Sequence, residues 1–395
     1  MKRLAKLLTT AMLTGIGLFA GLASAQTLCV WDPLGTAGDY YTLFKDYQIE
    51  AKRWNVNLNL EVYPDDNDLI AKFENGHCDM ASILGLRARK FNKFTGTIDA
   101  APGSLDNYVQ MRNLLNVLVG PKASKYMTEG VTEVVGILPM GAGYAVTADR
   151  SVVSLQTAAG KRVLVPSFAD NFAELIKQIN VVEVRTEIVD YGRAFKQGKG
   201  DIIIMPLALY KPFEIDKVLA EKNGGILRRP LFEFTMQVLD HPEKFPAGFG
   251  QSSRDYLAQQ TDRSLSLARN MDNQVDARLW IYMKHSDFDY WDEVTRRIET
   301  EMTRQGLLDK RMLNLMQRVR CGTNSDEPEC RAINVQKQEQ EQQAGSKECF
   351  RRQARMTLSS GCGPDRLFPS KLSVTPVNHL GAATQSENEC SDTPE

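Results

Sequence analysis

Short apolar runs alternate with amphipathic segments through the first half of the chain. Apolar residues at a spacing near 3.6, such as Tyr40, Phe44 and Tyr47, predict a helix, whereas alternation or a short continuous apolar run predicts a strand. The predicted elements of this first unit are a strand at 27–31, a helix at 40–54, a strand at 56–63, a helix at 65–75 and a strand at 80–86. The order strand, helix, strand, helix, strand favours a parallel α/β sheet.

The pattern then repeats in a second unit of similar size. The elements predicted next are a helix at 107–118, strands at 131–137 and 143–147, a helix at 155–159, a strand at 160–166, a helix at 171–179, a strand at 181–188, a helix at 191–197 and a strand at 201–205. Two such units predict two α/β lobes joined by crossing strands. Because ligand sites favour the crevice between lobes, this organisation points to a binding cleft.

The last third of the chain changes character twice. Amphipathic helices are predicted at 252–270, 290–305 and 307–319, and we expect them to pack on the first lobe. Beyond Cys321 the chain is rich in Gln, Glu and Ser, and such a tail buries too little apolar surface to order itself. The predicted boundaries are a first lobe at 26–148 with 245–320, a second lobe at 149–244, and a poorly ordered tail at 321–395.

The amino terminus has the features of a secretory signal peptide. Basic residues precede an apolar run, and Ala23-Ser24-Ala25 forms a small-residue cleavage site, so we expect cleavage after Ala25 and a periplasmic mature protein. An uncleaved membrane anchor is the alternative, but the run is short and interrupted by threonines and glycines. The whole chain of 395 residues has a formal charge of −1, which gives no general attraction for nucleic acid. Its seven cysteines, in an exported protein, predict disulfides.

The segment that concentrates binding chemistry is 76–105. A buried strand ends near Gly85, and the turn after it presents Arg87 and Arg89 among other polar residues. The carboxyl ends of parallel strands are where open α/β sheets meet ligands. A basic surface turn is the alternative interpretation. The loop at 32–39, after the first strand, carries two glycines that allow close backbone approach to a ligand.

These considerations select candidate ligand-binding residues at the ends of predicted strands. The candidates are Asp32, Thr36, Gly38, Leu86, Arg87, Arg89, Asn92, Ser167, Asp170, Asn171 and Tyr210. Two alternatives remain open, a helix cap at Ser167 and a salt bridge between Asp32 and Arg87.

Catalytic motifs are missing from the sequence. The four histidines are far apart, and neither a HExxH nor a GxSxG motif is present. We therefore expect no catalytic residues, no metal site and no cofactor, and we predict a protein that is not an enzyme.

Several segments resemble a known family. CVWDPLGTAGDYY at 29–41, the segment 76–105, GKRVLVPS at 160–167 and the segment 190–206 resemble AdeT-like solute-binding proteins of Gram-negative bacteria and, more distantly, the extracytoplasmic receptors of TRAP transporters. The resemblance covers roughly residues 26 to 320. It implies a periplasmic type II binding-protein fold, in which two lobes close about a hinge on a small solute. The resemblance includes anions among the expected solutes and implies that the protein serves a transport system.

The resemblance also carries departures and consequences. TRAP receptors usually have an arginine that clamps a substrate carboxylate two residues before the proline that corresponds to Pro166, and this chain has Leu164 at that position. They also usually have an asparagine just before the proline that corresponds to Pro206, where this chain has Met205. Arg162 could substitute only if the ligand shifts. In this fold the first and third strands are neighbours, so Cys29 and Cys78 are a candidate disulfide, with two free thiols as the alternative. An inner-membrane transporter or efflux components are the implied partners, and an envelope adaptor that keeps the fold without solute delivery is the alternative function.

Overall fold

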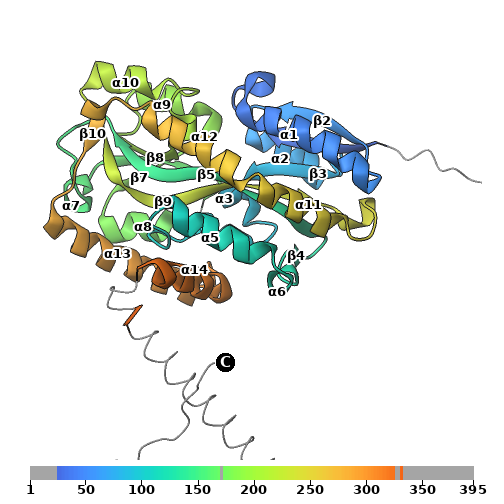
Figure 1. The fold of residues 1–395 in the computed structure, drawn as a ribbon. Helices are drawn as coiled ribbons and strands as arrows, with labels where there is room; N and C mark the ends of the chain where they lie inside the picture. Colours follow the sequence, from blue (N-terminus) through green and yellow to red (C-terminus); the bar gives the residue numbers. More distant parts are fainter. Residues whose placement is uncertain (1–24, 170–171, 325–329, 332–395) are drawn as a thin grey trace, which may run out of the picture. The chain divides into compact units, whose positions relative to one another are not determined.

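The computed structural model describes residues 25–169, 172–324 and 330–331. The predicted signal peptide up to residue 24, the candidates Asp170 and Asn171, and the predicted tail from residue 332 lie outside these described residues. The described residues up to Cys330 form one compact unit, whose fold is shown in Figure 1.

The first lobe is built on three parallel strands with two helices between them. Its elements are β1 (Gln26–Trp31), α1 (Asp39–Ala51), β2 (Leu58–Tyr63), α2 (Asp66–Glu74) and β3 (Met80–Leu84). The strands pair in the order β2-β1-β3. Strand β3 is buried along its whole length, as expected for a parallel strand covered on both faces. This arrangement confirms the α/β pattern predicted from the sequence.

The second lobe repeats the arrangement. Its elements are α7 (Leu155–Ala158), β6 (Arg162–Pro166), α8 (Phe172–Ile179), β7 (Val182–Thr186), α9 (Tyr191–Lys196), β8 (Ile202–Pro206) and α10 (Ile215–Lys222). Strand β6 pairs in parallel with both β7 and β8, which gives the order β8-β6-β7.

Two long strands join the lobes into a single sheet. Strands β5 (Thr132–Thr147) and β9 (Gly225–Asp240) are 16 residues each and run antiparallel to one another. Strand β9 pairs with β3 of the first lobe and β5 pairs with β8 of the second, so the sheet order is β2-β1-β3-β9-β5-β8-β6-β7. Figure 1 shows β5 and β9 passing between the two groups of strands and helices.

The prediction of separate strands at 131–137 and 143–147 is wrong, because β5 is continuous through both. The pairing with β9 shifts its register between Pro139 and Gly141, and such a bulge accommodates residues that a regular ladder does not. The crossing strand β9 has no counterpart among the predicted elements.

Helices cover the sheet and account for the rest of the described chain. The elements not yet named are α3 (Gly85–Ala88), α4 (Lys93–Ala100), α5 (Tyr108–Val119), α6 (Pro121–Ser124), β4 (Thr128–Glu129), α11 (Phe249–Gln259), α12 (Thr261–Asn273), β10 (Trp280–Ile281), α13 (His285–Arg304) and α14 (Lys310–Thr323). The predicted single helix at 252–270 is wrong, since α11 and α12 are separated at Gln260; both pack on β5. Among the described helices, none is long and apolar enough to cross a membrane.

Two disulfides are present in the described residues. Cys29 in β1 is bonded to Cys78, the residue pair named from the sequence, and the closed loop spans 49 positions. Cys321 is bonded to Cys330 across 9 positions. The first bond ties β1 to the segment just before its neighbour β3, and the second ties the last turn of α14 to Cys330.

Removing the longer disulfide should destabilise the protein more than removing the shorter one. The entropy that a cross-link removes from the unfolded chain grows with loop length, which gives about 4 kcal/mol for the Cys29–Cys78 loop and about 2.5 kcal/mol for the Cys321–Cys330 loop. Urea unfolding of Cys29→Ala/Cys78→Ala, with Cys321→Ala/Cys330→Ala as the matched control, measures both losses. Equal losses, or a larger loss in the control, would contradict the prediction.

Candidate functional site

The carboxyl ends of strands from both lobes meet across a shared crevice. One part of it is an inter-lobe pocket with an empty volume of about 630 Å³. The residues that line the inter-lobe pocket are Asp32, Pro33, Leu34, Asp39 and Tyr40 after β1, Ala208, Leu209, Lys211 and Pro212 after β8, and Leu267, Ala268, Met271 and Gln274 on α12. Most of this lining is apolar. A cleft with few polar groups, at strand ends and between lobes, is the usual place for a small-molecule site.

Asp32 is the most deeply held polar group of the inter-lobe pocket. Its Oδ1 accepts the backbone N–H of Leu34 at 3.0 Å, and its Oδ2 accepts those of Tyr40 and Tyr41 at 3.1 Å each. Burial raises the pKa of this carboxyl, and the three N–H donors oppose that rise. Gly38 lies against the carboxylate, since a Cβ there would sit 1.9 Å from its oxygens. The loop is therefore closed around Asp32.

A second group of crevice residues forms what we call the Arg87 junction, made of Asp66, Asn67, Arg87, Phe168 and Glu187. The Arg87 guanidinium donates from Nε to Asp66 Oδ2 at 2.8 Å and from Nη2 to Asn67 Oδ1. Its carbon Cζ lies 3.7 Å from the ring centroid of Phe168 in the second lobe, a cation–π contact. The Arg87 side chain is only 12% exposed. The salt bridge between Asp32 and Arg87, considered from the sequence, is not formed, because Asp66 occupies that role.

A hydrogen bond also crosses between the lobes at this junction. Asn67 Nδ2 donates to Glu187 Oε2 at 2.7 Å. The hydrogen bond from Asn67, together with one from the Ser167 side chain, lowers the pKa of Glu187. Ser167 therefore bonds to a carboxylate of its own lobe. The two lobes thus touch through side chains that follow β2 and β3 in the first lobe and β6 and β7 in the second.

The turn that carries Arg87 rests on a buried acid. Asp99 on α4 is fully buried, and it accepts the backbone N–H of Thr235 at 2.7 Å and lies 2.6 Å from the hydroxyl of Thr235 on β9. The backbone N–H of Leu86 also donates to Asp99. A Cβ on Gly85 would come within 2.2 Å of the Asp99 carboxylate, so only glycine fits at the start of the turn. Burial raises the pKa of Asp99 to about 8.

The remaining candidates lie in other surroundings. Thr36 is exposed in the loop after β1, and Leu86 and Tyr210 are buried. Arg89 donates from Nε and Nη2 to the carbonyl of Leu307, and Asn92 caps α4 by accepting the N–H of Thr95. These contacts give Arg89 and Asn92 structural roles within the first lobe, and the structure does not bring them together with Arg87.

Strand β6 carries no arginine that could take the place of the carboxylate-clamping arginine expected from the resemblance to TRAP receptors. Leu164 is 1% exposed in the middle of β6. Arg162 stands at the start of β6, where its Nη2 bonds to Asp201 at 2.6 Å and its Nε to the same carboxylate at 3.0 Å. It is therefore engaged at the opposite end of the strand from the crevice. Met205 is buried in β8.

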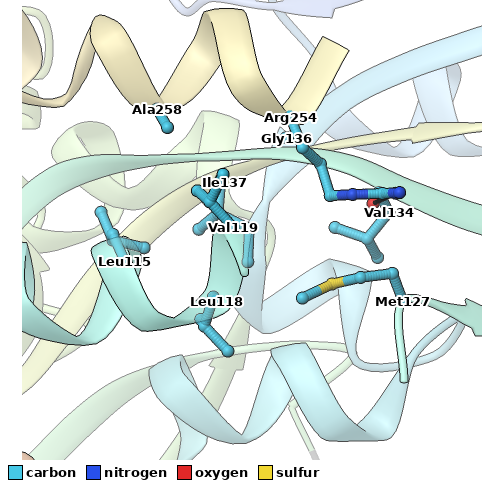
Figure 2. A pocket seen from close by; sticks show the side chains of 9 residues that line it. All are labelled: Leu115, Leu118, Val119, Met127, Val134, Gly136, Ile137, Arg254 and Ala258. Carbon is cyan, nitrogen blue, oxygen red and sulfur yellow. Dashed lines mark hydrogen bonds between the residues drawn. The ribbon is translucent and has the colours of Figure 1, made fainter. Parts of the chain in front are cut away.

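A separate cavity lies inside the first lobe. It is bounded by α5, β5 and α11, as Figure 2 shows, and its lining is aliphatic apart from the Arg254 side chain. Arg254 is held by Glu133 and by the carbonyl of Val134. Because no residue of β6, β7 or β8 lines this cavity, we do not assign it to solute binding.

Sequence reasoning missed most partners of Arg87. Asp66 and Asn67 lie in the first turn of α2, within the segment predicted as a helix at 65–75. Phe168 follows β6, and Glu187 falls at the end of the segment predicted as a strand at 181–188. Asp99 lies inside the segment 76–105, but a lone carboxylate in an apolar helix was the available signal and was not used. Within the described residues, no group of His, Cys, Asp and Glu could hold a metal ion.

Comparison with known proteins gives one family. The family model of the solute-binding protein AdeT 1/2 matches residues 48–335. The probable solute-binding protein AdeT1 of Acinetobacter baumannii is 34% identical over 305 residues, which is 77% of this chain and 99% of that protein. The probable solute-binding protein AdeT2 of the same organism is 24% identical over 219 residues, covering 55% of this chain and 92% of that protein. The family resemblance found in the sequence is thereby confirmed.

Solved structures share the fold at much lower identity. A TRAP periplasmic solute-binding protein from Ralstonia eutropha H16, with bound (S)-2-acetolactate, matches with a TM-score of 0.62 at 11% identity over 75% of this chain and 98% of that one. Another, from Rhodoferax ferrireducens with bound malonate, matches with a TM-score of 0.60 at 14% identity over 76% of this chain and 100% of that one. These matches confirm the predicted two-lobed periplasmic binding-protein fold.

The raised pKa of Asp99 predicts a pH-dependent stability. With its pKa raised to about 8, Asp99 keeps its proton in the folded protein up to about that pH, whereas the unfolded chain releases it near the ordinary pKa of 3.8. The stability contributed by the protonated carboxyl is therefore present at low pH and is lost as the pH rises, by up to about 1.4 kcal/mol per pH unit. Asp99→Asn keeps a neutral group of the same shape, so its free energy of unfolding should fall less steeply than that of the wild type between pH 5.5 and 7.5.

Urea unfolding across this pH range measures the two slopes. The control is Asp276→Asn, because the hydrogen bond from Arg278 lowers the pKa of Asp276 to about 2, outside the range tested. Parallel curves for the wild type and Asp99→Asn would show that Asp99 is ionised in the folded protein.

Proposed function

The chain belongs to the AdeT 1/2 solute-binding protein family, and we propose that it captures a small solute in the crevice between its two lobes and closes on it about the strands β5 and β9. The observation that supports this most directly is the inter-lobe pocket, whose walls come from the loop after β1 and the loop after β8. A solute in this space would touch both lobes at once. Contacts that exist only in the closed form are what allow a ligand to shift the population toward closure.

The Arg87 junction provides the contacts that the lobes make with each other on closure. Asn67 bonds to Glu187 at 2.7 Å and Arg87 lies over Phe168, and both pairs join one lobe to the other. Asp66 Oδ1 from the first lobe and the Tyr191 hydroxyl from the second are buried without a hydrogen-bond partner among the described residues.

Of the candidates from the sequence, we propose that Asp32 and Gly38 shape the wall of the inter-lobe pocket and that Arg87 and Ser167 act in closure. Thr36, Leu86 and Tyr210 adjoin these elements, and their contact with solute remains part of the proposal. We assign no catalytic residue, since binding and release by hinge motion need no chemical step.

Export to the periplasm and delivery to a membrane transporter complete the proposal. The signal-peptide pattern at residues 1–25 supports export. The disulfides Cys29–Cys78 and Cys321–Cys330 suit an oxidising compartment. A transporter of the inner membrane is the partner that a solute receptor of this fold would serve.

The proposed function is tested by the solute itself. Protein purified from the periplasm is denatured, and mass spectrometry identifies small molecules released from it; each is then added back to the emptied protein while small-angle X-ray scattering follows the radius of gyration. A molecule that is retained and that reduces the radius of gyration supports the receptor function. Protein that carries no solute and whose radius never changes would favour the adaptor alternative.

Breaking the inter-lobe hydrogen bond should open the protein. Asn67→Ala and Glu187→Ala each remove the same bond to a charged group, worth about 1.5 kcal/mol or more, which corresponds to about a tenfold loss of the closed form. Each variant should show a larger radius of gyration than the wild type, and the double variant should add little to either. Asn59→Ala, an exposed position on β2, is the control. Additive effects of the two substitutions would indicate that they act separately.

A further inference from the structure

The features of the crevice that could recognise an anion are already occupied by the chain itself. Helix α1 is 13 residues long, and the N-terminus of such a helix attracts negative charge through its free N–H groups. Here the backbone N–H groups of Tyr40 and Tyr41 donate to Asp32. A carboxylate of the protein therefore fills the position that a ligand carboxylate would take.

Arg87 is committed in the same way. Bidentate recognition of a carboxylate uses two adjacent N–H groups of a guanidinium. The Nε and Nη2 edge of Arg87 is engaged by Asp66 and Asn67, one face of the group lies on Phe168, and Asp66 neutralises the charge. An acid that bound at the Nε and Nη2 edge would have to displace a buried ion pair, and removing one partner of such a pair is strongly unfavourable.

The third anion-binding position of this fold is apolar in this chain. Leu164 takes the place of the clamping arginine, and Arg162 is bonded to Asp201 at the far end of β6. Lys211 is the one cation among the residues that line the inter-lobe pocket, and its Nζ is held by Asp216 at 2.6 Å. The pairing with Asp216 offsets part of the attraction that the Lys211 ammonium has for a further carboxylate.

What remains available in the inter-lobe pocket is negative charge and apolar surface. Asp39 is exposed at the start of α1, and its carboxylate makes no hydrogen bond or ion pair with the described residues. It lies close enough to Asp32 for the two charges to interact. Leu34, Leu267 and Met271 contribute aliphatic wall. At the Arg87 junction the buried atom left without a partner on the first lobe is again a carboxylate oxygen.

We propose that the solute is an amphipathic organic cation, an amine with an apolar body, and not the organic acid that the fold would suggest. The apolar body lies against the aliphatic wall of the inter-lobe pocket, and the ammonium group lies at Asp39, where it meets an unpaired carboxylate. The proposal rests on the function proposed above and specifies the chemical class of its ligand.

Three probes with one body and different head groups test this class. Isothermal titration calorimetry of the emptied full-length mature protein compares 3-phenylpropylamine, 3-phenylpropanol and 3-phenylpropionate. The amine should bind at least tenfold more tightly than the alcohol, and the acid more weakly than the alcohol. Asp39→Asn should weaken amine binding about fivefold to tenfold and leave the alcohol unchanged. Glu50→Gln, an acidic residue of the same helix outside the pocket lining, should change neither.

The outcomes separate the ligand class from the receptor function. Acid binding as tight as amine binding, or release of an anion from the purified protein, would overturn the cation proposal and leave the receptor function standing. Tight amine binding that Asp39→Asn does not weaken would overturn the assignment of the ammonium to Asp39, and with it the proposal. A protein that carries no solute and binds none of the three probes would count against both.

Discussion

The pairing of β5 with β9 is the constraint on which the rest of the structure depends. Each strand contributes to the sheet of both lobes, so neither lobe can be completed without the other. Register shifts along this pairing give the strands local bends, and at Gly141 a positive φ of 116° and a close approach to Ala268 and Tyr108 exclude other residues. Bending is therefore concentrated in the crossing strands, and the strand ends of the two lobes are left facing one crevice.

The acidic side chains at and beneath that crevice hold the lobes together before any solute arrives. Asp32 closes the loop after β1 onto the N-terminus of α1, and Asp66 holds the Arg87 guanidinium. Asp99, buried beneath the same turn, fixes Gly85 against β9. Each of these acidic side chains forms hydrogen bonds within the protein, and these bonds hold a loop or turn in one conformation. The cost of this order is that fewer charged groups are left to recognise a ligand.

Local pattern was sufficient to predict the lobes and to place the loops of the crevice. The apolar runs predicted β1 and β3. These two strands lie next to each other in the sheet, as the disulfide between Cys29 and Cys78 requires. Strand β9 was not predicted, although Phe232, Phe234, Met236 and Val238 alternate with polar residues in its second half. The sequence Arg228-Arg229-Pro230 interrupts the apolar pattern only in the first half, where β9 pairs with β10 and β5.

The contacts of Arg87 could not be predicted from the sequence for a different reason. Asp66 lies 21 residues earlier in the chain, and Phe168 belongs to the other lobe, so no spacing links them. Asn92 looked like a binding residue because it is polar and follows the same turn, yet its amide satisfies backbone groups of α4 and of the loop at Tyr126. Sequence identifies which residue types are available at a strand end, whereas the pairing among them is decided by tertiary packing.

Direct contacts between the lobes change what a solute must contribute. A ligand shifts a hinge equilibrium only by its differential affinity for the closed form, and a receptor with no contacts between its lobes must obtain all of that difference from the ligand. Here the bond from Asn67 to Glu187 and the stacking of Arg87 on Phe168 form between the lobes themselves. The free-energy difference between the open and closed forms, which the ligand must overcome, is correspondingly smaller. A solute with one charged group and an apolar body is then sufficient to stabilise the closed form, because burial of its apolar surface between the lobes adds to contacts that the protein already makes.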